Sequence, residues 1–295
     1  MAGVSAITVT HFTDPGCPFA YSASPALAVL HWRYGDQLEW DLVTIGLSES
    51  PERYVQAGYT PTKSAIGFQQ RFLRYGMPVL LEPRARVLGT ARACRAIVAT
   101  RRLYPGREEQ VLRALQFGWF TTTLLLDEDD AIAAALARVE GIEVPAVVAA
   151  IDDEQTLASY EQDKARTRSA EGSPTAFQGK ARQTDGPVRY SAPSLVFQTG
   201  DGRRLEAGGF QPVEAYDVLV ANLDPELDRR GPAEDALAAL RAFPGGLVTQ
   251  EVAAVMAPNN TPPDRAGAER ELIALLGDGA VTREPLGDDA LWTAA

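Results

Sequence analysis

Residues 12–19 of the 295-residue chain read FTDPGCPF, and this stretch separates a predicted strand from a predicted helix. The residues that lead into it, Ala6–Phe12 (AITVTHF), are β-branched and aromatic, which is typical of a strand. Asp14-Pro15-Gly16 predicts a tight turn at the end of that strand. Because Pro18 suits the first turn of a helix, a helix is expected to start directly after Cys17.

The chain after the turn continues as helix, strand and helical block. Apolar residues at helical spacing predict a helix over Pro18–Tyr34, and Gly35 ends it. Alternation in Leu38–Leu47 predicts a second strand, parallel to the first across a right-handed connection. Residues 51–175 are rich in Ala, Arg and Leu and form a predicted helical insertion. Helices expected within it are Val87–Leu103, Arg107–Phe120 and Asp129–Val139.

The chain then returns to the sheet. Gly and Pro in Glu171–Val188 predict a loop. Ser194–Gln198 and Arg203–Phe210 flank a Thr-Gly-Asp-Gly turn and predict a hairpin, and Pro212 precedes a last helix, Val213–Leu223. These elements predict an α/β fold with a large helical insertion.

Cys17 is the candidate reactive group. A thiol at a helix N-terminus faces unpaired backbone N–H groups and the positive end of the helix dipole, which favour the thiolate. We therefore expect the pKa of Cys17 to lie below the value of about 8.5 for free cysteine. The alternative is that Cys17 is a small buried apolar residue, which is the commoner role of a lone cysteine.

Three motifs, in order, resemble those of DsbA-like proteins of the FrnE type. Residues 12–19 resemble the F-x-D-P-x-C-P-W/F signature, residues 191–197 (SAPSLVF) resemble the cis-proline loop, and residues 208–212 (GGFQP) resemble the approach to the last helix. The resemblance implies a thioredoxin fold over residues 1–223, with the insertion at about 51–175. It also implies a cis bond before Pro193, which brings the backbone of Ala192 beside the thiol, where it can pair with a peptide or a small thiol.

The chain departs from that family at one position. Relatives carry C-x-x-C, whereas this chain reads Cys17-Pro18-Phe19-Ala20 and has no resolving thiol. Cys17 alone can form a mixed disulfide but not an internal one. The resemblance therefore implies a thiol-dependent oxidoreductase that acts through one cysteine on a thiol, a disulfide or a thiol adduct.

Two alternatives stay open. Residues 14–21 (DPGCPFAY) also resemble the D-F-x-S-P-Y-A-Y motif of 2-hydroxychromene-2-carboxylate isomerases and kappa-class glutathione transferases, which have serine at the position of Cys17. In those relatives a bound thiol cofactor does the chemistry, so that resemblance implies that Cys17 hydrogen-bonds or activates the sulfur of glutathione or mycothiol. The small thiol would be a co-substrate, and no bound cofactor is expected. The other alternative is a non-catalytic module that senses a redox signal or a small ligand.

Further candidates surround the motif. We predict that Pro18, Phe19, Tyr21, Ala192 and Pro193 bind substrate, although aromatic residues on a first helix more often pack in the core.

The helix at residues 89–96 resembles an N-T-x-x-A-H-R helix of the same families, with Gly89 replacing Asn and Cys94 replacing His. Cys94 is expected to be a buried helix residue, and a Cys17–Cys94 bridge is the alternative.

The insertion contributes three further candidates, Gln116, Trp119 and Phe120. Their side chains either cover a cleft beside Cys17 or pack in the core. His11 on the first strand is expected to be structural.

Residues 224–232 (DPELDRRGP) are a predicted linker to a separate segment at 233–295. Its predicted elements are helices at Ala233–Phe243, Thr249–Met256 and Asp264–Leu276 and a hairpin at Ala280–Trp292. This order resembles a winged helix. Its four arginines stand against ten acids, a net charge of −6, which disfavours DNA. Contact with the main domain or with a second copy in a homo-oligomer is expected instead, with Trp292 either at that interface or in the segment's own core.

Composition limits the remaining classes. The net charge of −11 disfavours nucleic acid or an anionic membrane as the main partner. Two cysteines and two histidines predict no disulfide framework and no metal site. The N-terminal MAGVSAITVTHF lacks the pattern of a secretory signal, and no apolar run is long enough for a membrane span, so a cytoplasmic protein is expected.

Overall fold

The structure, a computed structural model, describes residues 7–184 and 186–295 and centres on a four-stranded sheet in the order β2-β1-β3-β4. β1 is parallel to β2 and antiparallel to β3, which in turn is antiparallel to β4. The strands are β1 (Ile7–Thr13), β2 (Leu38–Thr44), β3 (Ser194–Gln198) and β4 (Arg204–Gly208). The predicted βαβ opening and hairpin are both present, and Ala6 of the predicted first strand lies outside the described residues.

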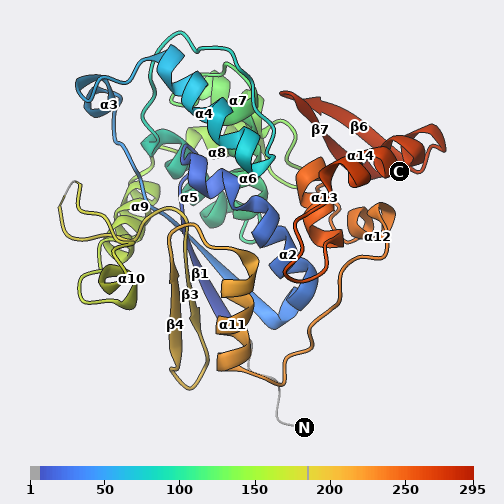
Figure 1. The fold of residues 1–295 in the computed structure, drawn as a ribbon. Helices are drawn as coiled ribbons and strands as arrows, with labels where there is room; N and C mark the ends of the chain where they lie inside the picture. Colours follow the sequence, from blue (N-terminus) through green and yellow to red (C-terminus); the bar gives the residue numbers. More distant parts are fainter. Residues whose placement is uncertain (1–6, 185) are drawn as a thin grey trace.

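The helices fall into three groups along the chain (Figure 1). The first group follows β1 and consists of α1 (Pro18–Ser22), α2 (Ser24–Tyr34) and the short 3-10 helix η1 (Gly35–Gln37). The insertion consists of α3 (Glu52–Gln56), α4 (Pro61–Tyr75), α5 (Ala91–Leu103), α6 (Glu108–Thr121), α7 (Asp129–Leu136), α8 (Val144–Ala149), α9 (Glu154–Thr167) and α10 (Pro174–Phe177). The last group follows β4 and begins with α11 (Val213–Leu223).

The predicted helix Pro18–Tyr34 is two helices that meet at Ala23. Pro25 lies in the first turn of α2 and has no N–H to donate to the carbonyl of Tyr21, so the helix cannot run through unbroken. One continuous helix was therefore a wrong prediction. The break leaves α1 as a short helix whose N-terminus holds the motif cysteine, while α2 and α11 pack on one face of the sheet.

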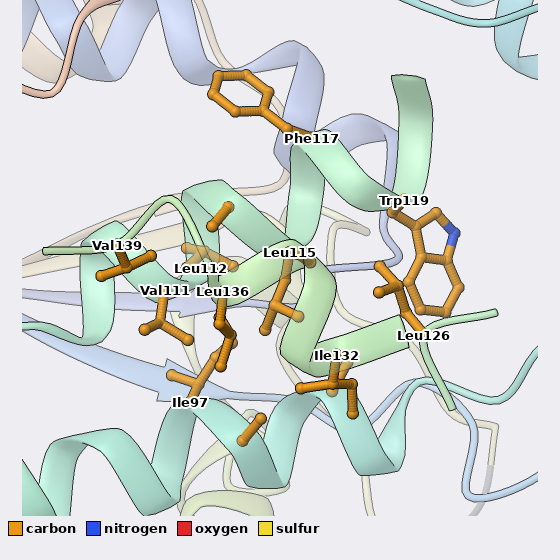
Figure 2. Packing of buried hydrophobic residues seen from close by; sticks show 14 of the residues in the cluster. Ile97, Val111, Leu112, Leu115, Phe117, Trp119, Leu126, Ile132, Leu136 and Val139 are labelled. Carbon is orange, nitrogen blue, oxygen red and sulfur yellow. The ribbon is translucent and has the colours of Figure 1, made fainter. Parts of the chain in front are cut away.

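The insertion has its own core. Helices α5, α6 and α7 bring together Ile97, Leu115, Ile132 and Leu136, all with fully buried side chains (Figure 2). The same cluster includes Tyr21 of α1, so the core of the insertion continues into the helix of the motif. Packing of this kind fixes the insertion against the end of β1, where the candidate site lies.

Residues 233–295 form a second, three-stranded sheet in the order β5-β7-β6 with three helices. The elements are α12 (Ala236–Arg241), β5 (Leu247–Val248), α13 (Thr249–Met256), α14 (Arg265–Gly277), β6 (Val281–Leu286) and β7 (Asp289–Ala294). The predicted helices and hairpin are all there, and only β5 was not predicted. Trp292 is buried, and its Nε1 donates to Thr249 Oγ1 at 3.0 Å, within the segment's own core.

This last segment packs on α2. Ala28, Val29 and Trp32 of α2 belong to the same apolar cluster as α12, α13 and β7. The connecting residues also lie against α2, because the Arg230 N–H donates to the Arg33 carbonyl at 3.0 Å and Trp32 Nε1 donates to the Gly231 carbonyl at 2.6 Å. Residues 224–232 are therefore bound to the helix rather than extended away from it.

The β6–β7 hairpin tip makes a second contact, with the segment after α4. Val79 N–H donates to Asp288 Oδ1 at 2.8 Å, and Asp288 N–H donates to the Val79 carbonyl at 3.1 Å. Gly287 has a φ of +57°, and a Cβ atom at this position would lie 2.7 Å from the Val79 oxygen. The contact therefore requires glycine at the hairpin tip.

The Gly287→Ala substitution should destabilise the protein more than the matched change Gly279→Ala. Both glycines have positive φ, but a Cβ atom at Gly279 meets nothing within 4 Å. Gly279→Ala should lower the free energy of unfolding by about 1 kcal/mol for backbone strain alone. Gly287→Ala should cost a further ~1–3 kcal/mol, since the hairpin tip must move off Val79. Urea unfolding followed by tryptophan fluorescence measures both, and equal losses would show that the contact with Val79 is not tight.

Candidate active site

Cys17 occupies the N-cap of α1, as the motif predicts. Its N–H donates to the Asp14 carbonyl at 3.1 Å, which closes the turn between β1 and α1. Its Sγ donates a hydrogen bond to the carbonyl oxygen of Ala192 at 3.4 Å, and the Ala192–Pro193 peptide bond is cis. The structure thus brings the motif cysteine and the loop at residues 191–197 together, although 175 positions separate Cys17 from Ala192.

Burial controls the ionisation of Cys17. The residue is 5% exposed and lies in an apolar cluster that includes Val43, Tyr190 and Ala192. Burial raises the pKa of Cys17 to about 11, and the N–H groups of Ala20 and Phe19 at the helix N-terminus oppose this only in part. The expected lowering of the pKa is therefore wrong, because desolvation outweighs the helix terminus.

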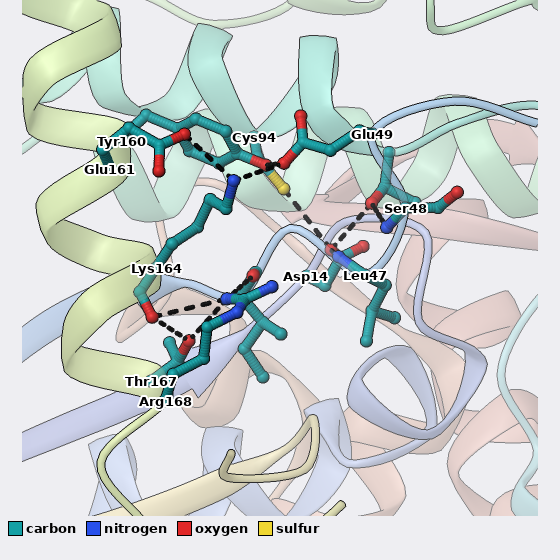
Figure 3. A network of polar contacts seen from close by, with 12 residues as sticks. Asp14, Leu47, Ser48, Glu49, Cys94, Tyr160, Glu161, Lys164, Thr167 and Arg168 are labelled. Carbon is teal, nitrogen blue, oxygen red and sulfur yellow. Dashed lines mark hydrogen bonds and ion pairs between the residues drawn. The ribbon is translucent and has the colours of Figure 1, made fainter. Parts of the chain in front are cut away.

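Asp14 is the polar centre beside the thiol. Its side chain is fully buried and accepts hydrogen bonds from the N–H groups of Gly16 and Leu47 and from Thr90 Oγ1, at 2.9, 2.8 and 2.9 Å. Cys94 Sγ donates to the same carboxylate at 3.4 Å (Figure 3). Burial raises the pKa of Asp14, and these four donors work against that shift. Asp14 thereby joins the motif turn, the segment after β2 and the start of α5.

Cys94 is fully buried and belongs to the hydrogen-bond network around Asp14. Burial, and then the charge of Asp14, raise the pKa of Cys94 well above its ordinary value. Both cysteines are free thiols with different hydrogen-bond partners, so the alternative of a Cys17–Cys94 bridge is not what the structure contains.

A cavity of about 480 Å³ opens beside the motif, and Cys17 itself is not among the residues that line it. Gly16, Pro18 and Phe19 form one wall, and α3, α4 and the loop at residues 80–90 form the others. A Cβ atom on Gly16 would lie 2.6 Å from Thr90 Cγ2 and 2.8 Å from the Trp119 ring, so the wall at this point is closed by direct packing. Phe19 is 42% exposed and faces this space.

Basic side chains outnumber acids around the cavity. Lys63, Arg71, Arg84 and Arg86 line it, against Glu82. Arg86 is paired with Asp127 and Glu128, and Arg84 donates to the carbonyls of Thr122 and Leu124. The Arg71 guanidinium lies 4.4 Å from the Phe19 ring centroid, directly beside the motif. Lys63 Nζ donates to the Gly58 carbonyl at 3.0 Å. Arg71 is therefore the group best placed to receive a carboxylate of a ligand, with Lys63 as a second positive charge at the cavity wall.

The predicted site residues separate into two places. Pro18 and Phe19 line the cavity, whereas Ala192 and Pro193 are buried on the side where Cys17 Sγ points. Tyr21 is not brought to the cavity, since its ring is fully buried against Phe120 and its Oη donates to the Pro78 carbonyl at 3.0 Å. Two residues of helix turn the chain by about 200°, so Tyr21 faces the core when Phe19 faces the cavity.

The insertion residues also divide. Trp119 and Phe120 line the cavity beside the motif, whereas Gln116 lines a different one, together with His11 of β1. Tyr54 of α3 was not predicted and lies in the cavity wall, where burial and then the charges of Asp14 and Cys17 raise its pKa. No motif marks Tyr54, and only the packing of α3 over the cavity identifies it.

Comparison with solved structures identifies the fold. A candidate protein disulfide isomerase from Nitrosomonas europaea aligns with 75% of this chain and 99% of its own, at 16% identity and a TM-score of 0.57. The cytosolic disulfide reductase DsbM from Pseudomonas aeruginosa with GSH aligns with 73% of this chain and 98% of its own, at 18% identity and a TM-score of 0.51. A probable DsbA oxidoreductase from Streptomyces coelicolor aligns with 77% and 92%, at 17% identity and a TM-score of 0.52.

The chain therefore has the DsbA-like thioredoxin fold with a helical insertion, which confirms the predicted fold class. No family model and no curated protein matches the sequence. Among the described helices, none has the length and apolar character needed to cross a membrane. Within residues 7–184 and 186–295, no group of three or more His, Cys, Asp or Glu side chains is placed to hold a metal ion.

Alkylation of Cys17 by iodoacetamide should rise about tenfold for each pH unit between about pH 7 and pH 10, because only the thiolate reacts. The raised pKa also stabilises the fold at pH values below the unfolded-state pKa of about 8.5, and this contribution is lost as pH rises toward 11. Peptide mass spectrometry measures the reaction, with Cys94 as the slow internal control. A plateau at or below about pH 8.5 would show that the helix terminus, not burial, sets the pKa.

Proposed function

We propose that the protein is a thiol-dependent oxidoreductase that acts through Cys17 alone, with a low-molecular-weight thiol such as glutathione or mycothiol as its second thiol. The observation that carries this proposal is the position of Cys17 at the N-cap of α1, hydrogen-bonded to the Ala192 carbonyl. The fold shared with disulfide oxidoreductases supports it. The neighbour DsbM is described as cytosolic, and we place the reaction in the cytoplasm.

The chemistry needs two exchange steps. First, the Cys17 thiolate attacks a mixed disulfide between a substrate thiol and the small thiol, and forms its own mixed disulfide with the small thiol while the substrate leaves as a thiolate and takes up a proton. Second, the thiolate of another small-thiol molecule attacks that adduct, which regenerates Cys17 and releases the small-thiol disulfide. Because Ala20 replaces the second cysteine, no internal disulfide competes with this route.

The cavity supports a small thiol as the co-substrate. Its volume of about 480 Å³ falls in the range of small-molecule sites. Lys63 and Arg71 offer positive charge to the carboxylates of a peptide thiol such as glutathione, and Phe19 offers an apolar contact. The neighbour DsbM has a structure with GSH.

One observation favours a second candidate function. A thiol whose pKa is raised to about 11 stays protonated at neutral pH and can donate a hydrogen bond, as the serine of glutathione-dependent isomerases and kappa-class transferases does. In that function Cys17 would stabilise the thiolate of the bound small thiol, and the sulfur of the co-substrate would do the chemistry.

The Cys17→Ser variant separates the two candidates. Exchange needs sulfur at this position, so Cys17→Ser should lose all reduction of a glutathionylated peptide, while Cys94→Ser should retain it. Transfer of glutathione to a chlorodinitrobenzene electrophile should survive in Cys17→Ser only if residue 17 acts as a hydrogen-bond donor. Reduction that persists in Cys17→Ser would contradict the proposal, and persistent transfer without reduction would establish the second candidate.

The Ala20→Cys variant tests the role of the missing thiol. Wild type should oxidise a reduced dithiol peptide poorly, and Ala20→Cys should gain this activity because a second thiol can then form and donate an internal disulfide. Efficient oxidation by wild type that Cys94→Ser leaves unchanged would contradict the single-thiol proposal.

A further inference from the structure

Helix α4 lies at the surface of the insertion and has an exposed stripe along its outer side (Figure 1). The stripe consists of Lys63, Ile66, Gln70, Leu73 and Arg74, which fall within about 100° of one another around the helix axis. All five are exposed, and the two large apolar side chains among them, Ile66 and Leu73, are 47% and 72% exposed. The exchange reaction proposed above uses only Lys63 of this stripe.

The α4 stripe is continuous with the rim of the cavity beside the motif. Lys63 belongs to both, and Arg71 lines the cavity on the adjoining side of the helix, with its guanidinium over the Phe19 ring. Phe19 and Tyr59 add exposed aromatic rings to the same rim. A partner that lies along the stripe therefore reaches Phe19, which is two residues after Cys17.

Charge distinguishes this part of the chain from the rest. Residues 51–75 hold four basic residues, Arg53, Lys63, Arg71 and Arg74, against one acid, Glu52, a net charge of +3 in a chain whose net charge is −11. Within residues 7–184 and 186–295 none of these four cations forms an ion pair, and three of them contact only a carbonyl oxygen or an aromatic ring. Such a surface is electrostatically complementary to an acidic partner.

The chemistry of the stripe fits a polypeptide. Its apolar side chains Ile66 and Leu73 alternate with the cations Lys63 and Arg74, so a complementary partner needs both apolar groups and carboxylates. The negative charge of the whole chain disfavours nucleic acid or an anionic membrane. A second copy of the chain would cover the rim of the cavity and close the approach to the motif.

We propose that the α4 stripe docks an acidic and apolar segment of a polypeptide substrate, next to the cysteine that carries the mixed disulfide. This inference rests on the proposed function and names its substrate class. Apolar side chains of the segment pack on Ile66 and Leu73, and its carboxylates pair with Lys63 and Arg74. Docking then holds the substrate disulfide at the motif.

Fluorescence anisotropy of a labelled peptide with the full chain tests the docking directly. The probe is rich in Glu and Leu and has Ser where a substrate has cysteine, so its binding does not depend on thiol exchange. We expect a Kd below about 100 μM, and at least about tenfold weaker binding when Lys replaces Glu or Ser replaces Leu in the probe. Added salt should also weaken binding, because it screens exposed charges.

Helix α14 offers matched control positions, since Arg270 and Ile273 form a similar exposed pair of a basic and an apolar side chain. Arg74→Glu and Leu73→Ser should each weaken binding of the Glu-Leu probe about tenfold or more. Arg270→Glu and Ile273→Ser should leave the Kd within about twofold of wild type. All four side chains are exposed, and circular dichroism checks that each variant is folded.

The proposal is overturned if the Glu-Leu probe does not bind up to about 1 mM, if the Lys probe binds as tightly, or if Arg74→Glu binds as Arg270→Glu does. It is also overturned if sedimentation velocity finds a dimer that Arg74→Glu dissociates, because a second copy then covers the stripe. Probe binding without reduction of the glutathionylated peptide would support the docking surface and contradict the proposed function.

Discussion

The buried carboxylate of Asp14 is the interaction on which the site depends. It accepts four hydrogen bonds, from Gly16, Leu47, Thr90 and Cys94, and none of the ion pairs of the described residues includes it. Those donors come from the motif turn, the segment after β2 and the beginning of α5, so one side chain ties the insertion to the sheet. Without the carboxylate, the half-buried N–H groups of Gly16 and Leu47 would lose their acceptor, at a cost below the roughly 1–3 kcal/mol of a fully buried donor.

The same burial decides what Cys17 can do. Relative to free cysteine, a pKa of about 11 favours the neutral thiol over the thiolate by roughly 3 kcal/mol. A helix N-terminus typically contributes up to about 2 kcal/mol in the opposite direction, which is less than the desolvation here. The two functions considered for this site therefore differ in what they require: a hydrogen-bond donor uses the protonated resting thiol, whereas exchange needs Cys17 to lose that proton before its sulfur forms a bond.

The sequence predicted what depends on local pattern. Val213–Leu223 and Thr249–Met256 are helices with the predicted bounds, and the N-cap position of Cys17 follows from Pro18. The pKa of Cys17 was not predictable, because it depends on Val43, Tyr190 and Ala192, which approach only in the folded chain. The contact of Cys94 with Asp14 spans 80 positions and has no local signal. The burial of Tyr21, in contrast, was predictable, because helical geometry alone directs its side chain away from the face of α1 that Phe19 occupies.

Intact-protein and peptide mass spectrometry after incubation with glutathione disulfide identifies the cysteine that exchanges. At a pH near 9, where more of the buried thiol is ionised, we expect one glutathione adduct per chain, located on Cys17 and removed by excess glutathione. Lys63→Gln with Arg71→Gln should slow adduct formation, because these side chains carry the positive charge beside Phe19. An adduct on Cys94, or none on Cys17, would contradict the assignment of Cys17 as the exchanging thiol.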